Sequence, residues 1–173
     1  MFESVGNLPL HPLVLHAVVI GIPLALLASL FFALPRTRSW ARLALPVVAV
    51  GALVATFVAK ESGEALQRTL AASQQLEPGT PTAVLIQAHA HLAGQLMLIM
   101  VGVAVLALVN AVVVGRVGGT PERRGSRGRD VVLVALLVAS AFVASFWVYR
   151  VGDVGARAVW NPTGDANYSS STR

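Results

Sequence analysis

Four long apolar runs, separated by polar segments, dominate the pattern of this chain. They cover about residues 13–34, 41–60, 88–115 and 131–150. A helix needs about 20 consecutive apolar residues to cross the hydrocarbon core of a bilayer, and each run is close to that length. The pattern predicts an all-α fold, a four-helix transmembrane bundle, with residues 1–150 as one domain. Residues 151–173 are expected to form a partly mobile tail. No sequence repeat relates the two halves of the bundle.

The composition agrees with a membrane protein. Charged residues make up 12% of the 173 residues, about half of the roughly 25% that is typical of soluble domains. Too few polar side chains remain to cover a surface that faces water, which excludes an ordinary soluble enzyme. The chain has no cysteine, which excludes disulfides, thiolate-bound iron–sulfur clusters and covalently attached c-type haem.

The arginines between the runs predict an orientation. The connections after the first and third runs carry eight of them: Arg36, Arg38, Arg42, Arg116, Arg123, Arg124, Arg127 and Arg129. Basic loops stay in the cytoplasm. We therefore expect a multi-pass protein of the bacterial cytoplasmic membrane, in contact with the lipid bilayer, with both termini outside. Because orientation accounts for the arginines, no nucleic-acid partner is expected.

The long connection between the second and third runs has structure of its own in this prediction. Residues 61–77 read as a short amphipathic helix that continues or follows the second span, with Glu64 and Arg68 as an i,i+4 pair. It is expected to stop at Pro78-Gly79. Thr80-Pro81 then resembles a helix start, with threonine as the cap and proline in the first turn.

All four histidines lie near the outer ends of the predicted spans. His11 and His16 belong to the first span, and His89 and His91 to the third. Ionisable groups at membrane depth usually face the interior of a bundle and mark a site. Neutral imidazole is also the commonest nitrogen ligand of haem iron, zinc and copper. We therefore expect a haem or metal site at the depth of these histidines, near the outer ends of the spans.

The first hypothesis is a b-type haem held between the first and third helices. His16 and either His89 or His91 would be its axial ligands, because His89 and His91 point in different directions on a helix. Small residues at Ala90, Ala93 and Gly94 would admit the macrocycle. Its propionates would need cations, for which the candidates are Arg150, Arg68 and Lys60. His11, at a helix start before a proline, reads most simply as an interfacial residue but stays among the candidates.

Two other hypotheses remain open. A non-haem zinc, copper or iron ion would need three or four ligands, drawn from His16, His89, His91, Glu61 and Glu64. Alternatively, the protein is a non-catalytic accessory subunit of a larger membrane complex, or a homo-oligomer. The haem hypothesis implies electron transfer between a quinone and a redox partner at the outer face. The metal site would serve transport, sensing or catalysis, so enzymatic activity stays open, although an electron-transfer or accessory protein is favoured over a stand-alone enzyme.

Three motifs follow one another along the chain: LPLHPLVLHAVV, KESGEAL and AHAHLAG. In sequence and order they resemble a family of small four-span bacterial membrane proteins, often actinobacterial, classed as a domain of unknown function. The resemblance carries over to His11, His16, Gly63, Glu64 and His89. Members more often have an acid where His91 stands, and the resemblance therefore favours His89 as the third-helix ligand. Some members are fused or adjacent to Rieske-type redox domains, which implies electron transfer.

Overall fold

The computed structural model describes residues 4–5, 8–114 and 127–166, and these residues form four long helices. They are α1 (Leu10–Ala33), α2 (Arg38–Ala72), α3 (Pro81–Val113) and α4 (Arg127–Trp160). A pair of two-residue antiparallel strands, β1 (Ser4–Val5) and β2 (Leu8–Pro9), precedes α1. All four helices are long and apolar enough to cross a membrane, which confirms the predicted bundle. A helix suits such sequences because it satisfies every backbone hydrogen bond internally.

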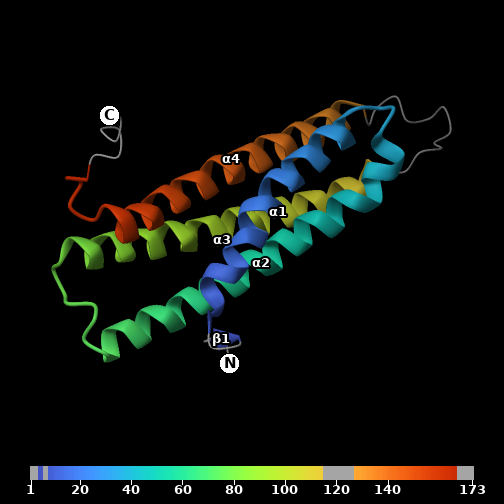
Figure 1. Cartoon of the computed structure of the whole chain (residues 1–173). Helices are drawn as coiled ribbons and strands as arrows, with labels where there is room; N and C mark the ends of the chain where they lie inside the picture. Colours follow the sequence, from blue (N-terminus) through green and yellow to red (C-terminus); the bar gives the residue numbers. More distant parts are fainter. Residues whose placement is uncertain (1–3, 6–7, 115–126, 167–173) are drawn as a thin grey trace, which may run out of the picture.

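The helices form a ring in chain order. α1 packs against α2 and α4, and α3 packs against α2 and α4, so that neighbours run antiparallel. Figure 1 shows that α2 and α3 diverge toward one end of the bundle, and that α1 begins short of that end. We call it the histidine end, because His11 and His89 lie near it. The opposite end, where Arg38 and Arg42 lie, is the arginine end.

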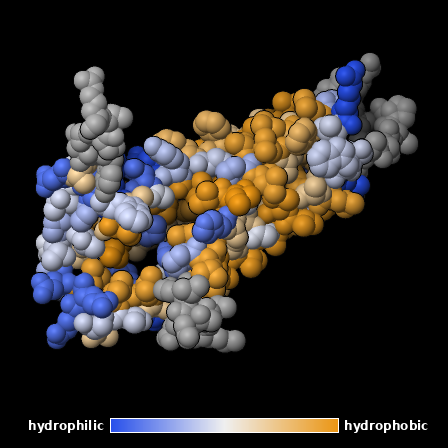
Figure 2. All heavy atoms as spheres, in the orientation of Figure 1, coloured by the Kyte–Doolittle hydropathy of each residue, from blue (hydrophilic) through white to orange (hydrophobic). Residues whose placement is uncertain are grey.

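The core of the bundle consists mainly of small side chains. Ala41, Ala49, Ala107 and Ala141 are at most 1% exposed, whereas many large apolar side chains point outward. Figure 2 shows this apolar surface along the bundle, with polar side chains gathered toward its ends. In a bilayer, lipid is as apolar as leucine, so helix contacts favour small residues that allow close approach. The exposed leucines, valines and phenylalanines form the surface toward lipid.

Hydrogen bonds between helices tie the arginine end together. Arg38 donates to the carbonyls of Phe32 and Ala33 at the end of α1, both at 3.0 Å. Arg42 of α2 donates to the Ala111 carbonyl in the last turn of α3, also at 3.0 Å. The last carbonyls of a helix have no partner within it. The arginines therefore satisfy helix ends as well as being the charges from which orientation was predicted.

Buried Asn110 adds a link between α3 and α4. Its amide nitrogen donates to the Leu133 carbonyl at 3.1 Å and to the Leu106 carbonyl at 2.9 Å. Its side chain is fully buried, and the carbonyl oxygen of its amide has no partner among the described residues. Hydrogen bonds therefore hold α2, α3 and α4 together at the arginine end, whereas α2 and α3 diverge at the histidine end.

Three details of the prediction can be compared with the helix bounds. The threonine cap is confirmed: α3 begins at Pro81, and the Thr80 hydroxyl accepts a hydrogen bond from the Ala83 N–H at 3.3 Å. The helix expected over residues 61–77 continues the second span, because α2 runs without a break to Ala72. α4 likewise continues to Trp160, ten residues beyond the expected end of the fourth span. The arginine-rich segment 115–126 lies outside the described residues.

Candidate functional site

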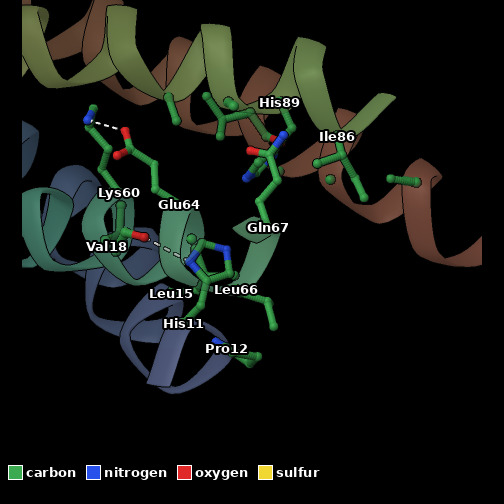
Figure 3. A pocket seen from close by; sticks show the side chains of 18 of the residues that line it. His11, Pro12, Leu15, Val18, Lys60, Glu64, Leu66, Gln67, Ile86 and His89 are labelled. Carbon is green, nitrogen blue, oxygen red and sulfur yellow. Dashed lines mark hydrogen bonds and ion pairs between the residues drawn. The ribbon is translucent and has the colours of Figure 1, made fainter. Parts of the chain in front are cut away.

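The structure brings His11 of α1 and His89 of α3 together near the histidine end. Their ring centroids are 6.2 Å apart, and the ring planes are almost perpendicular at 89°. Figure 3 shows the two imidazoles extending toward one another from opposite helices. His11 Nδ1 lies 2.8 Å from the Ala59 carbonyl oxygen of α2, and His89 Nδ1 lies 2.9 Å from the Val151 carbonyl oxygen of α4. Each histidine is therefore fixed by the partner helix of its own hairpin.

Two glycines make room for the rings. A Cβ placed on Gly63 of α2 would lie 3.0 Å from both Nδ1 and Cε1 of His11. A Cβ placed on Gly155 of α4 would lie 2.8 Å from Nδ1 and 3.0 Å from Cε1 of His89. Such distances are shorter than ordinary van der Waals contacts. Glycine is required at both positions for the imidazole edge to rest against the helix backbone.

The two halves of the site have the same construction. In each hairpin, a histidine of the first helix binds a backbone carbonyl of the second helix, and the glycine against its ring follows that carbonyl residue by four positions. The sets are His11, Ala59 and Gly63 in one hairpin, and His89, Val151 and Gly155 in the other. The structure thus contains a local repeat that the sequence did not reveal, because only one histidine and one glycine per hairpin carry it.

A cavity of about 660 Å³ surrounds the histidine pair, with walls from all four helices. Its lining is mainly valine, leucine, isoleucine, alanine and glycine. Pockets for cofactors are typically apolar, measure about 300–1,000 Å³ and contain a few placed polar groups. The polar side chains on this lining are those of the two histidines and of Thr56, Lys60, Glu64, Gln67 and Thr82.

The charges at the edge of the cavity are paired with each other. The Lys60 ammonium group forms an ion pair with Glu64 one turn later on α2, and it lies 3.6 Å from a carboxylate oxygen of Glu61. Arg68 does not form the expected pair with the Glu64 carboxylate. Its Nε donates instead to the backbone carbonyl of Glu64, at 3.2 Å.

His16 and His91, two of the expected ligands, lie outside this cavity. Both side chains are exposed. His16 Nδ1 lies 3.1 Å from the Pro12 carbonyl of its own helix, and His91 Nε2 lies 3.1 Å from the Gln95 amide nitrogen. The structure consequently pairs His89 with His11, and not with His16. The reason is the helical repeat: His16 follows His11 by five positions, which places the two side chains about 140° apart around α1.

The other expected residues are also not assembled around one atom. Arg68 and Arg150 are exposed, and neither lines the 660 Å³ cavity. Glu61 and Glu64 are engaged with Lys60. Over residues 8–114 and 127–166, no group of three or more His, Cys, Asp or Glu side chains is placed to hold a metal ion. The donor set proposed for a non-haem ion is therefore not brought together.

Gly155 and Gln67 belong to the site but were not singled out from the sequence. A signal for Gly155 exists in the spacing of the core residues. On α4 the buried positions Leu137, Ala141, Ala144, Val148 and Val151 follow a three-and-four spacing, which continues to 155. The corresponding row of buried positions on α3 passes through His89, and the row on α1 passes through His11. Once the structure has given the buried positions, these rows select His11, His89 and Gly155.

Comparison with known proteins gives one match. No curated protein and no solved structure matches this chain. The model of a family described as "Predicted membrane protein (DUF2231)" matches residues 7–164, nearly the whole chain and all four helices of the bundle. This match confirms the resemblance to a four-span membrane family of unknown function. With these four membrane-length helices, the chain belongs to the DUF2231 family of predicted membrane proteins.

Proposed function

We propose that this protein binds a b-type haem between His11 and His89 and carries electrons in the membrane. The observation that carries the proposal is the pair of imidazoles, each with Nδ1 on a backbone carbonyl and the rings 6.2 Å apart in an apolar cavity. The metal-binding nitrogen of each ring is thereby left for a ligand.

The hydrogen bonds determine the tautomer of both rings. A backbone carbonyl oxygen can only accept a hydrogen bond, so Nδ1 of His11 and of His89 must carry the proton. In the neutral imidazole, Nε2 is then an unprotonated acceptor. Histidines that bind metals usually donate their other ring N–H in this way, which fixes the ring and raises its basicity. Two imidazoles with acceptor nitrogens, whose ring centroids are 6.2 Å apart in an apolar cavity, favour a shared Lewis acid.

The separation of the rings agrees with one metal between them. An ion on the line between two Nε2 atoms, about 2 Å from each, sets the ring centroids roughly 6 Å apart. The distance between the His11 and His89 centroids is 6.2 Å. His16 and His91, being exposed, offer no such pair. The proposed ligands are therefore His11 and His89, in place of the pair of His16 with His89 or His91 that was expected from the sequence.

The number of ligands favours haem over a bare ion. Protein-bound zinc almost always takes four ligands, and no third His, Cys, Asp or Glu joins the pair in the described part of the chain. A porphyrin supplies four nitrogens, so the protein needs to supply only two. The cavity of about 660 Å³ gives the space, and its apolar lining suits a macrocycle.

Two protein ligands also indicate the kind of chemistry. Haem held by His11 and His89 would supply a one-electron redox couple. The role of the two histidines would be to hold and orient the group in the cavity. We infer that membrane quinones and a redox protein at the histidine end are the partners, since the site lies near that end of membrane-length helices.

Spectroscopy of four histidine variants tests the proposal. The full-length protein is purified from cells supplied with haem, and absorption is recorded before and after dithionite reduction. We expect a low-spin Soret spectrum that is lost or converted to high spin in His11→Ala and in His89→Ala. The matched controls, His16→Ala and His91→Ala, remove exposed histidines of the same two helices and should keep it. A wild-type protein without a Soret band would overturn the proposal, as would loss in His16→Ala with retention in His11→Ala.

A further inference from the structure

The walls of the cavity differ in polarity. Apart from the histidines, its polar side chains are Thr56, Lys60, Glu64 and Gln67 of α2 and Thr82 of α3. The opposite wall, formed by α4 between Val148 and Val159, consists of valine, alanine and glycine only. A ligand that fits both walls must have one polar edge and one apolar edge.

Gln67 adds an amide group to this wall. It is half-buried, and it extends from α2 into the cavity beside His89, as Figure 3 shows. Its amide offers two N–H donors and one carbonyl acceptor. In the part of the chain that the structure describes, no hydrogen bond to this amide is formed. The amide is therefore available for hydrogen bonds to a polar group on the ligand.

Lys60 supplies a cation two helical turns before Gln67, on the same face of α2. Its ammonium group now pairs with Glu64. The Glu64 side chain is 45% exposed, so its carboxylate can turn to water when another anion approaches Lys60. Thr56, by contrast, already donates to the Ala52 carbonyl at 2.8 Å. Lys60 and Gln67 are the groups of this wall that are placed to bind an acidic ligand edge.

We propose that Lys60 and Gln67 bind the propionate carboxylates of the haem, so that its acidic edge faces α2 and its hydrocarbon edge faces α4. This inference rests on the proposed function of the cavity. It replaces Arg68 and Arg150, the cations expected from the sequence, which are exposed and lie outside the cavity lining. The two residues act on the position of the ligand and not on the iron.

Comparing haem b with its dimethyl ester tests this assignment. The ester keeps the iron and the macrocycle but has no carboxylate. Full-length protein without ligand is titrated in detergent with each compound, and the Soret band gives both dissociation constants. We expect the wild type to bind haem b about 10- to 100-fold more tightly than the ester, as charge-assisted hydrogen bonds imply. The ratio, rather than either constant, is compared between variants, because partition into detergent then cancels.

Three variants make the test specific. The double variant Lys60→Met, Gln67→Leu should bring the ratio close to one while both compounds still give a low-spin spectrum. Glu64→Gln should raise the ratio, because Lys60 loses its competing carboxylate. Arg68→Met, a change on the same helix outside the cavity, should leave the ratio unchanged. Equal binding of both compounds by the wild type, or an undiminished ratio in the double variant, would overturn the inference alone. Failure of both compounds to give a low-spin band would overturn the proposed function as well.

Discussion

The substitution Gly155→Ala tests whether the close packing of the His89 ring against Gly155 is needed for haem binding. The added Cβ would lie 2.8 Å from His89 Nδ1 and 3.0 Å from Cε1. An ordinary contact between these atoms is about 3.5 Å, so the ring must retreat by about 0.7 Å. The bond from Nδ1 to the Val151 carbonyl is 2.9 Å long. A retreat of this size from α4 stretches it to about 3.6 Å, beyond the range of a hydrogen bond.

The size of the effect follows from the lost bond. Removing the group that orients a metal-binding histidine typically costs about 10- to 100-fold in metal affinity, or about 1.4–2.8 kcal/mol. The fold itself should survive, because alanine is favoured over glycine within a helix by about 1 kcal/mol. We therefore expect Gly155→Ala to weaken haem binding by about 10- to 100-fold and to give a partly high-spin spectrum, without loss of the folded bundle.

A haem titration followed by the Soret band, with circular dichroism for helix content, measures both effects. Gly128→Ala is the matched control, because it lies on the same helix outside the cavity lining and a Cβ there meets no atom within 4 Å. Gly63→Ala, whose Cβ would lie 3.0 Å from the His11 ring, should give a smaller loss. The reasoning is refuted if Gly155→Ala binds haem as the wild type does, or if Gly128→Ala is equally damaging.

Two further predictions concern the ends of the bundle. Arg38→Met should lower the free energy of unfolding by about 2 kcal/mol, because two carbonyls at the end of α1 lose a charged donor. Arg36→Met removes an exposed arginine next to it and should change stability little; equal effects in thermal unfolding would contradict the assigned role of Arg38. The positive-inside rule predicts that a maleimide unable to cross membranes labels Ser73→Cys, but not Ser126→Cys, in intact cells. The chain has no cysteine of its own, and the opposite labelling pattern would reverse the predicted orientation.

The sequence predicted the helices well because membrane spans are defined by length and apolarity alone. It could not predict which face of each helix points inward. In a soluble bundle the inner face is the more apolar one, but lipid and core are both apolar here. His16, alone among apolar residues, therefore read as buried, although it is exposed. His11 read as interfacial, although the inner face that holds Val18 and Ile22 also holds His11.

The two glycines that lie against the histidine rings could not both be predicted from the sequence, for a different reason. Gly63 is part of the motif that carried the family resemblance, whereas Gly155 lies in no recognised motif. The close approach of a ring to a backbone depends on two helices that are distant in sequence: 62 positions separate His89 from Val151. Only the packing of α3 on α4 shows that Gly155 and His89 meet. The spacing of the buried residues along α4 includes position 155, but the sequence does not show which positions of α4 are buried.

The unequal ends of the bundle have a consequence for its biogenesis. Each helical hairpin can enter the membrane as a unit, and each carries one histidine with its carbonyl and its glycine. Arg42 and Asn110 join α2, α3 and α4 at the arginine end, while α2 and α3 stand apart at the other end (Figure 1). Insertion of the polypeptide can thus be completed before any ligand is bound. If haem binds between His11 and His89 as proposed, we expect maturation to be a late loading step, in which the cofactor links the two hairpins of an already assembled bundle.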